Sequence, residues 1–216
     1  MSKYGLPDHL LSEYTSGALD ADFEVLVASH LAISTASHED FRFHQEIAGA
    51  LLAGLSIDSA QSSPTPPSNL LETVSTASAG PQMAAQSDDM GEGLPNTLIE
   101  YLETLTGAKA LYELNWVPCF EGIERAVLTE GPEGVRARIL KCEPGAVFPT
   151  HGHGSEEVSL VLHGAYTDAG THYVRGDVQC ISADETHSPI IDDSEICFVL
   201  VVSELPAIIL DKSKVI

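Results

Sequence analysis

Lysine and arginine are scarce in this chain of 216 residues. They number ten, against 32 aspartate and glutamate residues, which gives a formal net charge of −22. Because contacts with phosphate groups depend on lysine and arginine, this balance argues against direct binding of nucleic acid. It also disfavours attachment to an anionic membrane surface, whereas a protein partner with a basic face is compatible with it.

Long apolar runs are also missing. No stretch reaches the roughly 18 consecutive apolar residues that a membrane-spanning helix needs. The first eight residues, MSKYGLPD, contain no apolar signal core. We therefore expect a cytoplasmic protein with no membrane partner.

Cysteine is rare, and no two cysteines form a CxxC pair. The four thiols are those of Cys119, Cys142, Cys180 and Cys197. In a cytoplasmic protein such cysteines are expected to be reduced and mostly buried. A redox role for one of them is the alternative.

Residues 1–55 predict a small helical domain. Apolar residues recur at helical spacing between Asp8 and Gly17 and again after Asp20, which is placed to cap a second helix. A third helix is expected from Ser37. Its apolar side is formed by Phe41, Ile47, Ala48, Leu51, Leu52 and Leu55. Three short helices bury little apolar area, so this domain needs packing of these faces, a further stabilising element or a partner.

Residues 56–93 read as a linker rich in serine and proline, with no lysine, arginine or aromatic residue and one short helical turn near 69–74. Residues 94–107 predict a fourth helix, with Pro95 in its first turn and Gly107 at its end. Its apolar stripe consists of Leu94, Leu98, Tyr101, Leu102 and Leu105. This helix either joins the two halves of the chain or packs on the N-terminal domain.

Residues 108–216 change to short apolar runs with a period of two, separated by turns. The expected strands are 111–116, 124–128, 135–141, 157–163, 172–174, 178–181, 196–202 and one near 207–210. Many short strands at this spacing predict an all-β sandwich or barrel.

A group of candidate metal ligands lies within this β segment. The pattern is Gly145-x5-His151-x-His153-x3-Glu157-x6-Gly164, followed later by Gly176-x10-His187. His151 and His153 are two residues apart, so they point to the same face of a strand. Three imidazoles and one carboxylate suit zinc, iron, manganese, nickel or copper. The alternative is a polar turn with solvated histidines.

Other polar residues near this pattern are not expected to bind the metal. His163 should face away from the barrel interior, and His172 should be solvated. Glu156, next to Glu157, is expected to face solvent rather than metal.

With these residues in place, the segment resembles the cupin superfamily, whose fold is a double-stranded β-helix, or jelly-roll, barrel. The first family motif matches at every position. The second departs at Ser182, Asp184 and Ile191, where the family commonly has Pro, Gly and Asn. The resemblance implies one divalent metal ion, with zinc preferred and iron, manganese or nickel as alternatives. Its ligands would be His151, His153, Glu157 and His187.

The chain as a whole resembles the ChrR-type anti-sigma factors. Asp8-x-Leu-Leu-x2-Tyr14-x2-Gly17 resembles the first helix of their helical domain, and Phe23-x3-Val27-x2-His30-Leu31 resembles the second. The resemblance implies that the N-terminal helices sequester a sigma factor of the extracytoplasmic-function (ECF) class. It also implies that the cupin serves as a sensor, for instance of oxidative stress.

One departure from this family concerns its N-terminal zinc site, usually formed by an upstream histidine and an H-x3-C-x2-C motif. Here the run is His30-x3-Ser34-x2-Ser37, and the upstream position falls near Gly5. Serine hydroxyls are poor zinc ligands beside thiolates. We therefore expect no zinc in the N-terminal domain, as a natural feature or through exchange of the cysteines.

In this interpretation Ser37 caps the third helix, and His30 is a core or interface histidine. A site rebuilt from His30 with His38 or His44 is the alternative.

Two further functions are compatible with the sequence. One is a cupin metalloenzyme of the dioxygenase kind, for which Glu156, Tyr173 and Arg138 are candidate pocket residues. The other is a cupin that binds a small ligand. Because the sequence offers little beyond the metal to carry catalysis, we do not expect an enzyme. A homodimer is allowed, by fold analogy alone.

Overall fold

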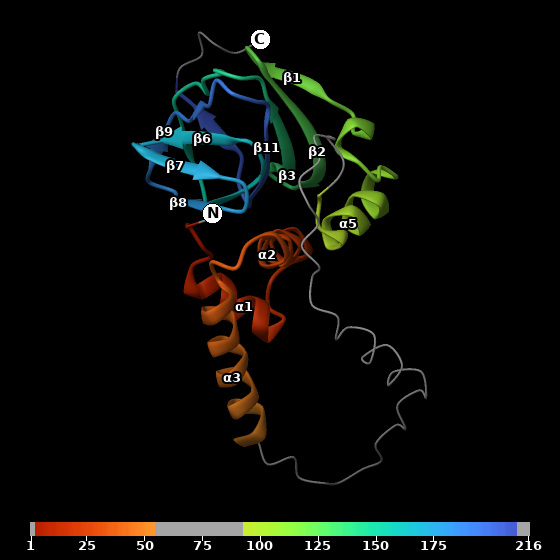
Figure 1. Cartoon of the computed structure of the whole chain (residues 1–216), viewed down its shortest axis with the longest axis vertical. Helices are drawn as coiled ribbons and strands as arrows, with labels where there is room; N and C mark the ends of the chain where they lie inside the picture. Colours follow the sequence, from red (N-terminus) through yellow and green to blue (C-terminus); the bar gives the residue numbers. More distant parts are fainter. Residues whose placement is uncertain (1–2, 55–92, 211–216) are drawn as a thin grey trace.

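The computed structural model describes residues 3–54 and 93–210. It shows a group of helices packed against one side of a β-barrel (Figure 1). The predicted fold class, a small all-α domain followed by a cupin β-barrel, is confirmed. The predicted linker lies outside the described residues except for Gly93, as does its short helical turn.

The helices begin and end where local sequence signals place them. They are α1 (Asp8–Ser16), α2 (Ala21–Ile33), α3 (His38–Gly54) and α5 (Asn96–Thr106). The Asp20 carboxylate caps α2 by accepting hydrogen bonds from the backbone N–H groups of Asp22 and Phe23. Gly17 and Gly107 end α1 and α5 in the left-handed conformation that glycine adopts without strain.

The β-domain contains twelve strands among the described residues. They are β1 (Val117–Phe120), β2 (Ile123–Gly131), β3 (Gly134–Cys142), β4 (His151–His153), β5 (Glu157–His163), β6 (Ala165–Asp168), β7 (Thr171–Val174), β8 (Val178–Ile181), β9 (Thr186–His187), β10 (Ile190–Ile191), β11 (Cys197–Ser203) and β12 (Ala207–Ile209). The strands expected from the sequence do not include β1, β4, β6, β9 or β10, although His151 and His153 were expected to lie on a strand. Strands β9 and β10 are only two residues long.

The strand predicted at 111–116 is wrong. Leu111–Glu113 form the short 3-10 helix η1, and β1 starts only at Val117. Leu111 and Leu114 are both buried and stand three residues apart, which places them on one side of a 3-10 turn. The indole N–H of Trp116 closes the turn by donating to the carbonyl of Leu111 at 3.0 Å.

One six-stranded antiparallel sheet, in the order β1-β2-β3-β11-β5-β8, separates the barrel interior from the helices. Its strand β11 shows the division. Val199 and Val201 point into the barrel cluster, whereas Phe198, Leu200 and Val202 belong to the cluster that also contains the helices. The two smaller sheets, β10-β6-β7 and β12-β4-β9, complete the barrel.

The helices share a hydrophobic core with the outer face of this sheet. Leu11, Leu26, Leu98 and Leu102 are fully buried in the same cluster as Leu200. Helix α5 packs on the N-terminal helices, because its Leu98 and Leu102 join that cluster together with Leu26 of α2.

The third helix departs from the expected packing. Phe41 lies against Tyr14, with ring centroids 5.7 Å apart. Ile47 and Leu51 were expected to hold the helices together, but they are exposed, as is Leu52 on the same helix. Helix α3 extends beyond α1 and away from the barrel, so no other described element covers its far end (Figure 1).

The N-terminal segment also pairs with the edge of the large sheet. The backbone N–H of Val178 in β8 donates to the carbonyl of Tyr4 at 2.9 Å, and the Asp177 carboxylate accepts from the backbone N–H of Tyr4 at 2.9 Å. Residues before α1 therefore cover an edge strand that would otherwise present open hydrogen-bonding groups.

Candidate metal centre

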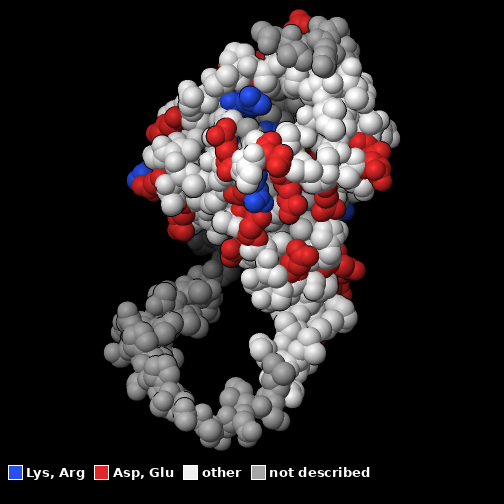
Figure 2. All heavy atoms as spheres, turned by 180° about the vertical axis from the view of Figure 1, so that it is seen from behind, with Lys and Arg blue, Asp and Glu red and all other residues white. Residues whose placement is uncertain are grey.

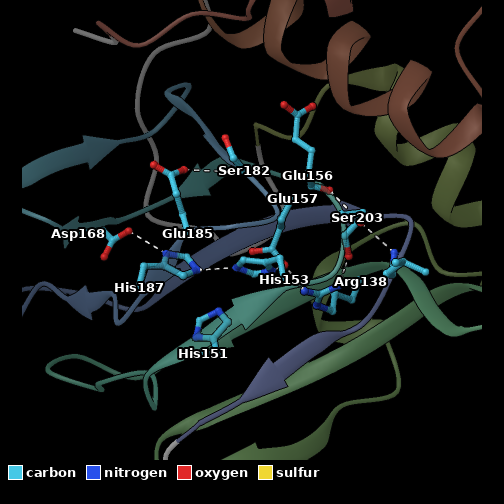
Figure 3. A network of polar contacts seen from close by, with 12 residues as sticks. Arg138, His151, His153, Glu156, Glu157, Asp168, Ser182, Glu185, His187 and Ser203 are labelled. Atoms are coloured by element: carbon cyan, nitrogen blue, oxygen red, sulfur yellow. Dashed lines mark hydrogen bonds and ion pairs between the residues drawn. The ribbon is translucent and has the colours of Figure 1, made fainter.

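The four candidate ligands meet inside the barrel although they come from three strands. His151 and His153 lie on β4, Glu157 opens β5, and His187 lies on β9, where it pairs in register with His151. One ligand atom from each of the four residues lies within 4.8 Å of every other (Figure 3). Among the described residues, these four form the one group of three or more His, Cys, Asp or Glu side chains that could hold a metal ion.

Neighbouring oxygen atoms fix the orientation of two of these histidines. Nδ1 of His151 lies 2.9 Å from the carbonyl oxygen of Pro149, and Nδ1 of His187 lies 2.8 Å from Oδ2 of Asp168. Both oxygens can only accept, so each Nδ1 carries the proton and each Nε2 keeps its lone pair for another partner. This arrangement is typical of metal-binding histidines.

His153 supplies the test of whether a cation fits. Its Nε2 lies 3.0 Å from Nε2 of His187, so two nitrogens of a kind that can bind a metal face each other. Its Nδ1 is buried without a hydrogen-bond partner and lies 3.5 Å from Oε2 of Glu157. Buried polar atoms are usually satisfied. A cation among these atoms would satisfy the facing nitrogens, so the donor set fits a divalent metal.

Burial favours the neutral, metal-binding form of His151 and His153. It lowers the pKa of His151 to about 4, helped by the nearby His187, and it also lowers the pKa of His153. Burial alone would raise the pKa of Asp168, but the hydrogen bonds from His187 and Gln179 outweigh burial and lower it.

The carboxylate of Glu157 is held from the other side by an arginine. Nη2 of Arg138 donates to Oε2 of Glu157 at 2.5 Å, and Nη1 donates to the Ser203 hydroxyl at 3.3 Å (Figure 3). Glu157 is buried, so the guanidinium compensates its charge and fixes its orientation.

The residues expected to stay away from the centre do so. His163 is exposed and lies 3.0 Å from Glu195, and exposed His172 lies 2.8 Å from Asp192. Glu156 faces outward and pairs with His9 at 3.0 Å. Of the three candidate pocket residues for catalysis, Glu156, Tyr173 and Arg138, only Arg138 lines the barrel cavity, and it is already bound to Glu157. Tyr173 stacks on Tyr166, with ring centroids 5.2 Å apart.

Sequence reasoning missed Asp168 and Gln179. The amide of Gln179 donates to Oδ2 of Asp168 at 2.7 Å, which helps to hold this carboxylate against His187. Both residues lie between the two motifs, Asp168 on the unpredicted strand β6. No pattern in the sequence identifies Asp168, because the alternation of buried positions along β6 is visible only in the structure.

The four cysteines are free, as predicted. Cys142 and Cys197 are buried, and Cys119 and Cys180 are partly buried. Burial raises the pKa of the Cys180 and Cys197 thiols to about 12. These two thiols are therefore protonated and unreactive at neutral pH.

Residues at the N-terminal zinc-motif positions form a hydrogen-bonded chain. The backbone N–H of Leu6 donates to Oγ of Ser37 at 2.8 Å, and Oγ of Ser37 lies 2.9 Å from Nε2 of His30. Nδ1 of His30 lies 2.8 Å from the carbonyl oxygen of Gly176 in the β-domain. His30 is thus both a core and an interface histidine, as predicted. Ser37 directly precedes α3, where it was expected to cap the helix. Its hydroxyl instead forms hydrogen bonds with Leu6 and His30.

The alternative N-terminal site is not assembled among the described residues. Nε2 of His38 lies 2.8 Å from the carbonyl oxygen of Leu31, and Nε2 of His44 lies 3.6 Å from Asp8. Neither joins His30 in a group of potential ligands. Within the same ranges, no helix has the length and apolar character needed to cross a bilayer.

The barrel and its four-residue centre define a cupin domain that follows a helical domain, and comparison with known proteins narrows this class. Residues 108–204 match the family model of the ChrR cupin-like domain. Over 206 residues, covering 94% of this chain and 91% of the relative, the sequence is 24% identical to the anti-sigma-E factor ChrR of Cereibacter sphaeroides.

A crystal structure of Rhodobacter sphaeroides SigE in complex with the anti-sigma ChrR shares the fold. The match covers 94% of this chain and 100% of that chain, with a TM-score of 0.70 and 24% identity. The predicted resemblance to ChrR-type proteins is therefore confirmed over the length of both domains, and residues 108–204 match the ChrR cupin-like domain.

Proposed function

We propose that this chain is a transcription regulator that acts as an anti-sigma factor, binding an ECF-type sigma factor through its N-terminal helices and using the cupin as a metal-containing sensor. The observation that carries the proposal is the resemblance to ChrR. It covers 94% of this chain and includes both domains in the same order. The relative is a regulator, and we propose a regulatory rather than an enzymatic role. Sigma factors act in the cytoplasm, where we place this protein.

The exposed stripe on α3 is the surface that we assign to the sigma factor. Phe43, Ile47 and Leu51 recur at intervals of four residues, with 60%, 42% and 68% of their surfaces exposed. Residues at this spacing share one face of a helix. A projecting helix with apolar side chains on its open face is typical of a surface that a partner covers.

A binding measurement tests this assignment. The full chain is mixed with an ECF sigma factor from the same organism, and the complex is measured by size-exclusion chromatography with light scattering. We expect a 1:1 complex with the wild type and at least about tenfold weaker binding for Leu51→Ser. The matched control is Leu210→Ser, because Leu210 is similarly exposed (57%) but lies at the end of the β-domain. Equal loss in both variants, or in neither, would remove α3 from the interface.

For the cupin we propose one divalent metal ion held by His151, His153, Glu157 and His187. Support comes from the oriented Nε2 atoms of His151 and His187, from Nε2 of His153, which faces Nε2 of His187 at 3.0 Å, and from burial, which lowers the pKa of His151 and His153. Zinc accepts such nitrogen and carboxylate ligands, and iron, manganese and nickel are the alternatives. When bound, the metal supplies a Lewis-acidic centre whose accessible face would border the cavity that His151, Glu157 and His187 line.

The large sheet offers a route by which an event at this centre reaches the helices. Its inner face carries Val199 and Val201 at the cavity, and its outer face carries Leu200 and Val202 against the helical core. Because interiors are close-packed, a displacement of β11 changes the packing on both faces. Sensing at the cupin would then alter the placement of the sigma-binding helices.

The N-terminal domain, in our proposal, contains no structural zinc, because the hydrogen-bonded chain through Ser37 and His30 occupies the position of the family's site. Metal analysis of the full chain by mass spectrometry tests both metal proposals together. We expect one equivalent in the wild type, none in the double variant His151→Ala/His187→Ala, and one in Ser37→Ala. A residual equivalent in the double variant would show a second site.

A further inference from the structure

The cupin domain encloses a cavity of about 220 Å³ beside the candidate metal centre. Its walls are mainly apolar and come from both ends of the β-domain sequence. They include Phe120, Leu140, Phe148, Val199, Val201 and Ile209. Binding sites for small molecules are commonly cavities of this kind, with apolar walls and a few polar groups that orient the ligand.

The principal polar groups along the inner part of this cavity already have partners within the protein. The Tyr166 hydroxyl donates to Oε1 of Gln179 at 2.8 Å, and the Gln179 amide donates to Asp168. Arg138 is bound to Glu157 and Ser203. These groups therefore offer little to the polar end of a ligand.

Arg125 is the exception. It lines the cavity, is exposed to solvent, and makes no hydrogen bond or ion pair with any residue that the structure describes. It stands opposite Leu140 in the pairing of β2 with β3, and Leu140 stands opposite Val199 in β11. The guanidinium thus lies at the outer end of an apolar row that leads into the cavity.

Among the described residues of the β-domain, 108–210, the other lysine and arginine side chains have hydrogen-bond or ion-pair partners, whereas Arg125 and, outside this domain, exposed Arg42 of α3 have none. Acidic side chains spread over the visible face in Figure 2, and lysine and arginine are few there. Lys109, Arg136, Arg138 and Lys141 each lie within ion-pairing distance of a carboxylate. The donors of Arg125 are free at the edge of an apolar cavity. A carboxylate from outside the chain would accept hydrogen bonds from them and compensate the charge of the guanidinium.

We propose that the cavity binds a small apolar monocarboxylate, with its apolar body between the cavity walls and its carboxylate on Arg125. The net charge of −22 disfavours anions that carry more than one charge. A neutral apolar molecule would fill the cavity but leave the guanidinium without a partner. This inference goes beyond the regulatory function proposed above and does not depend on it.

Calorimetric titration of the full chain with octanoate tests the proposal, and octanol provides the neutral comparison of equal chain length. We expect saturable 1:1 binding of octanoate and binding of octanol weaker by about tenfold or more, as expected for the loss of a charge-assisted hydrogen bond. Arg125→Met should weaken octanoate binding by a similar factor and leave octanol unchanged. Arg42→Met is the matched control, because Arg42 lies on α3 outside the cavity, and it should bind octanoate like the wild type.

Cavity-filling variants separate binding inside the barrel from binding on the surface. Val201→Phe should abolish octanoate binding while thermal denaturation remains cooperative. If this variant fails to fold, Ile209→Trp serves the same purpose from β12. Equal affinities for octanoate and octanol, unchanged binding in Arg125→Met, or unchanged binding in a folded cavity-filled variant would each overturn the proposal. So would octanoate binding that requires the metal but not Arg125, as measured after dialysis against a chelator.

Discussion

His30 of the helical domain and Gly176 of the β-domain are joined by a buried hydrogen bond, in which Nδ1 lies 2.8 Å from the carbonyl oxygen. Since a carbonyl can only accept, Nδ1 carries the proton, and Nε2 must accept from the Ser37 hydroxyl. Ser37 in turn accepts from the backbone of Leu6. Each donor in this series of three hydrogen bonds therefore has an acceptor. Through them the neutral imidazole of His30, on α2, links the N-terminal segment, the start of α3 and the cupin domain.

We predict that His30→Ala destabilises the full chain by about 2–4 kcal/mol, because the substitution leaves buried polar partners unsatisfied and opens a cavity. Urea denaturation measures the change. His9→Ala is the control, since His9 also bridges to the β-domain but is about half exposed in its pair with Glu156. The control should change the free energy of unfolding by less than about 1 kcal/mol. Similar losses in the two variants would refute a special role for His30.

Gly5 should tolerate no side chain. A Cβ atom placed there would lie 2.5 Å from Oγ of Ser37, within the hydrogen-bonded chain. We predict that Gly5→Ala costs about 1–3 kcal/mol and that Ser37→Ala in the same protein recovers part of that cost. Gly49→Ala is the matched control, because Gly49 lies within α3 with open space around its Cβ position, and it should stabilise the helix by roughly 0.5–1 kcal/mol. Additive effects of Gly5→Ala and Ser37→Ala would contradict this prediction.

His30 should also make the stability of the folded protein depend on pH. Burial lowers the pKa of His30 from 6.5 to about 4 in the folded protein. Between these values the unfolded chain binds a proton that the folded protein does not, so stability falls as the pH falls from about 6.5 to about 4 and is fully present above 6.5. The contribution of His30 amounts to up to about 3 kcal/mol. Unfolding free energies of wild type and His30→Gln, measured from pH 4 to 7, should converge as the pH falls, whereas parallel curves would exclude His30 as the source.

Asp168 should influence metal affinity without being a ligand. Its carboxylate orients His187 through the 2.8 Å contact with Nδ1. We predict that Asp168→Asn lowers metal affinity by about 10–100-fold, the usual effect of losing such a partner. Competition with a chromogenic chelator measures the affinity. Asp192→Asn is the control, because Asp192 contacts Nε2 of exposed His172 at the same distance, 2.8 Å, away from the metal centre, and the metal affinity of this variant should stay within about twofold of the wild type. Unchanged affinity in Asp168→Asn would contradict the prediction.

Features that depend on neighbouring residues in the sequence were predictable. The caps of α1, α2 and α5 follow from Gly17, Asp20 and Gly107, and the spacing of His151, His153 and Glu157 places them on one side of the barrel. Strands of two residues, such as β9 and β10, are too short to show a period.

Features that depend on distant partners were not predictable. His30 is bound by a backbone carbonyl 146 positions away, and any residue type supplies such a carbonyl. Asp168 lies between the two cupin motifs, with no spacing of its own to identify it. The apolar residues of α3 predict an amphipathic helix, but amphipathicity does not tell whether the same chain or a partner covers Ile47 and Leu51.

The central claim is that this chain inhibits a sigma factor, and transcription in vitro tests it most directly. Core RNA polymerase, an ECF sigma factor from the same organism and a promoter recognised by that sigma factor are combined with increasing amounts of the full chain. The proposed function predicts that transcripts disappear as the chain reaches equimolar amounts with the sigma factor, and that Leu51→Ser requires about tenfold more protein. Undiminished transcription in the presence of excess wild-type chain, for every ECF sigma factor of that organism, would contradict it.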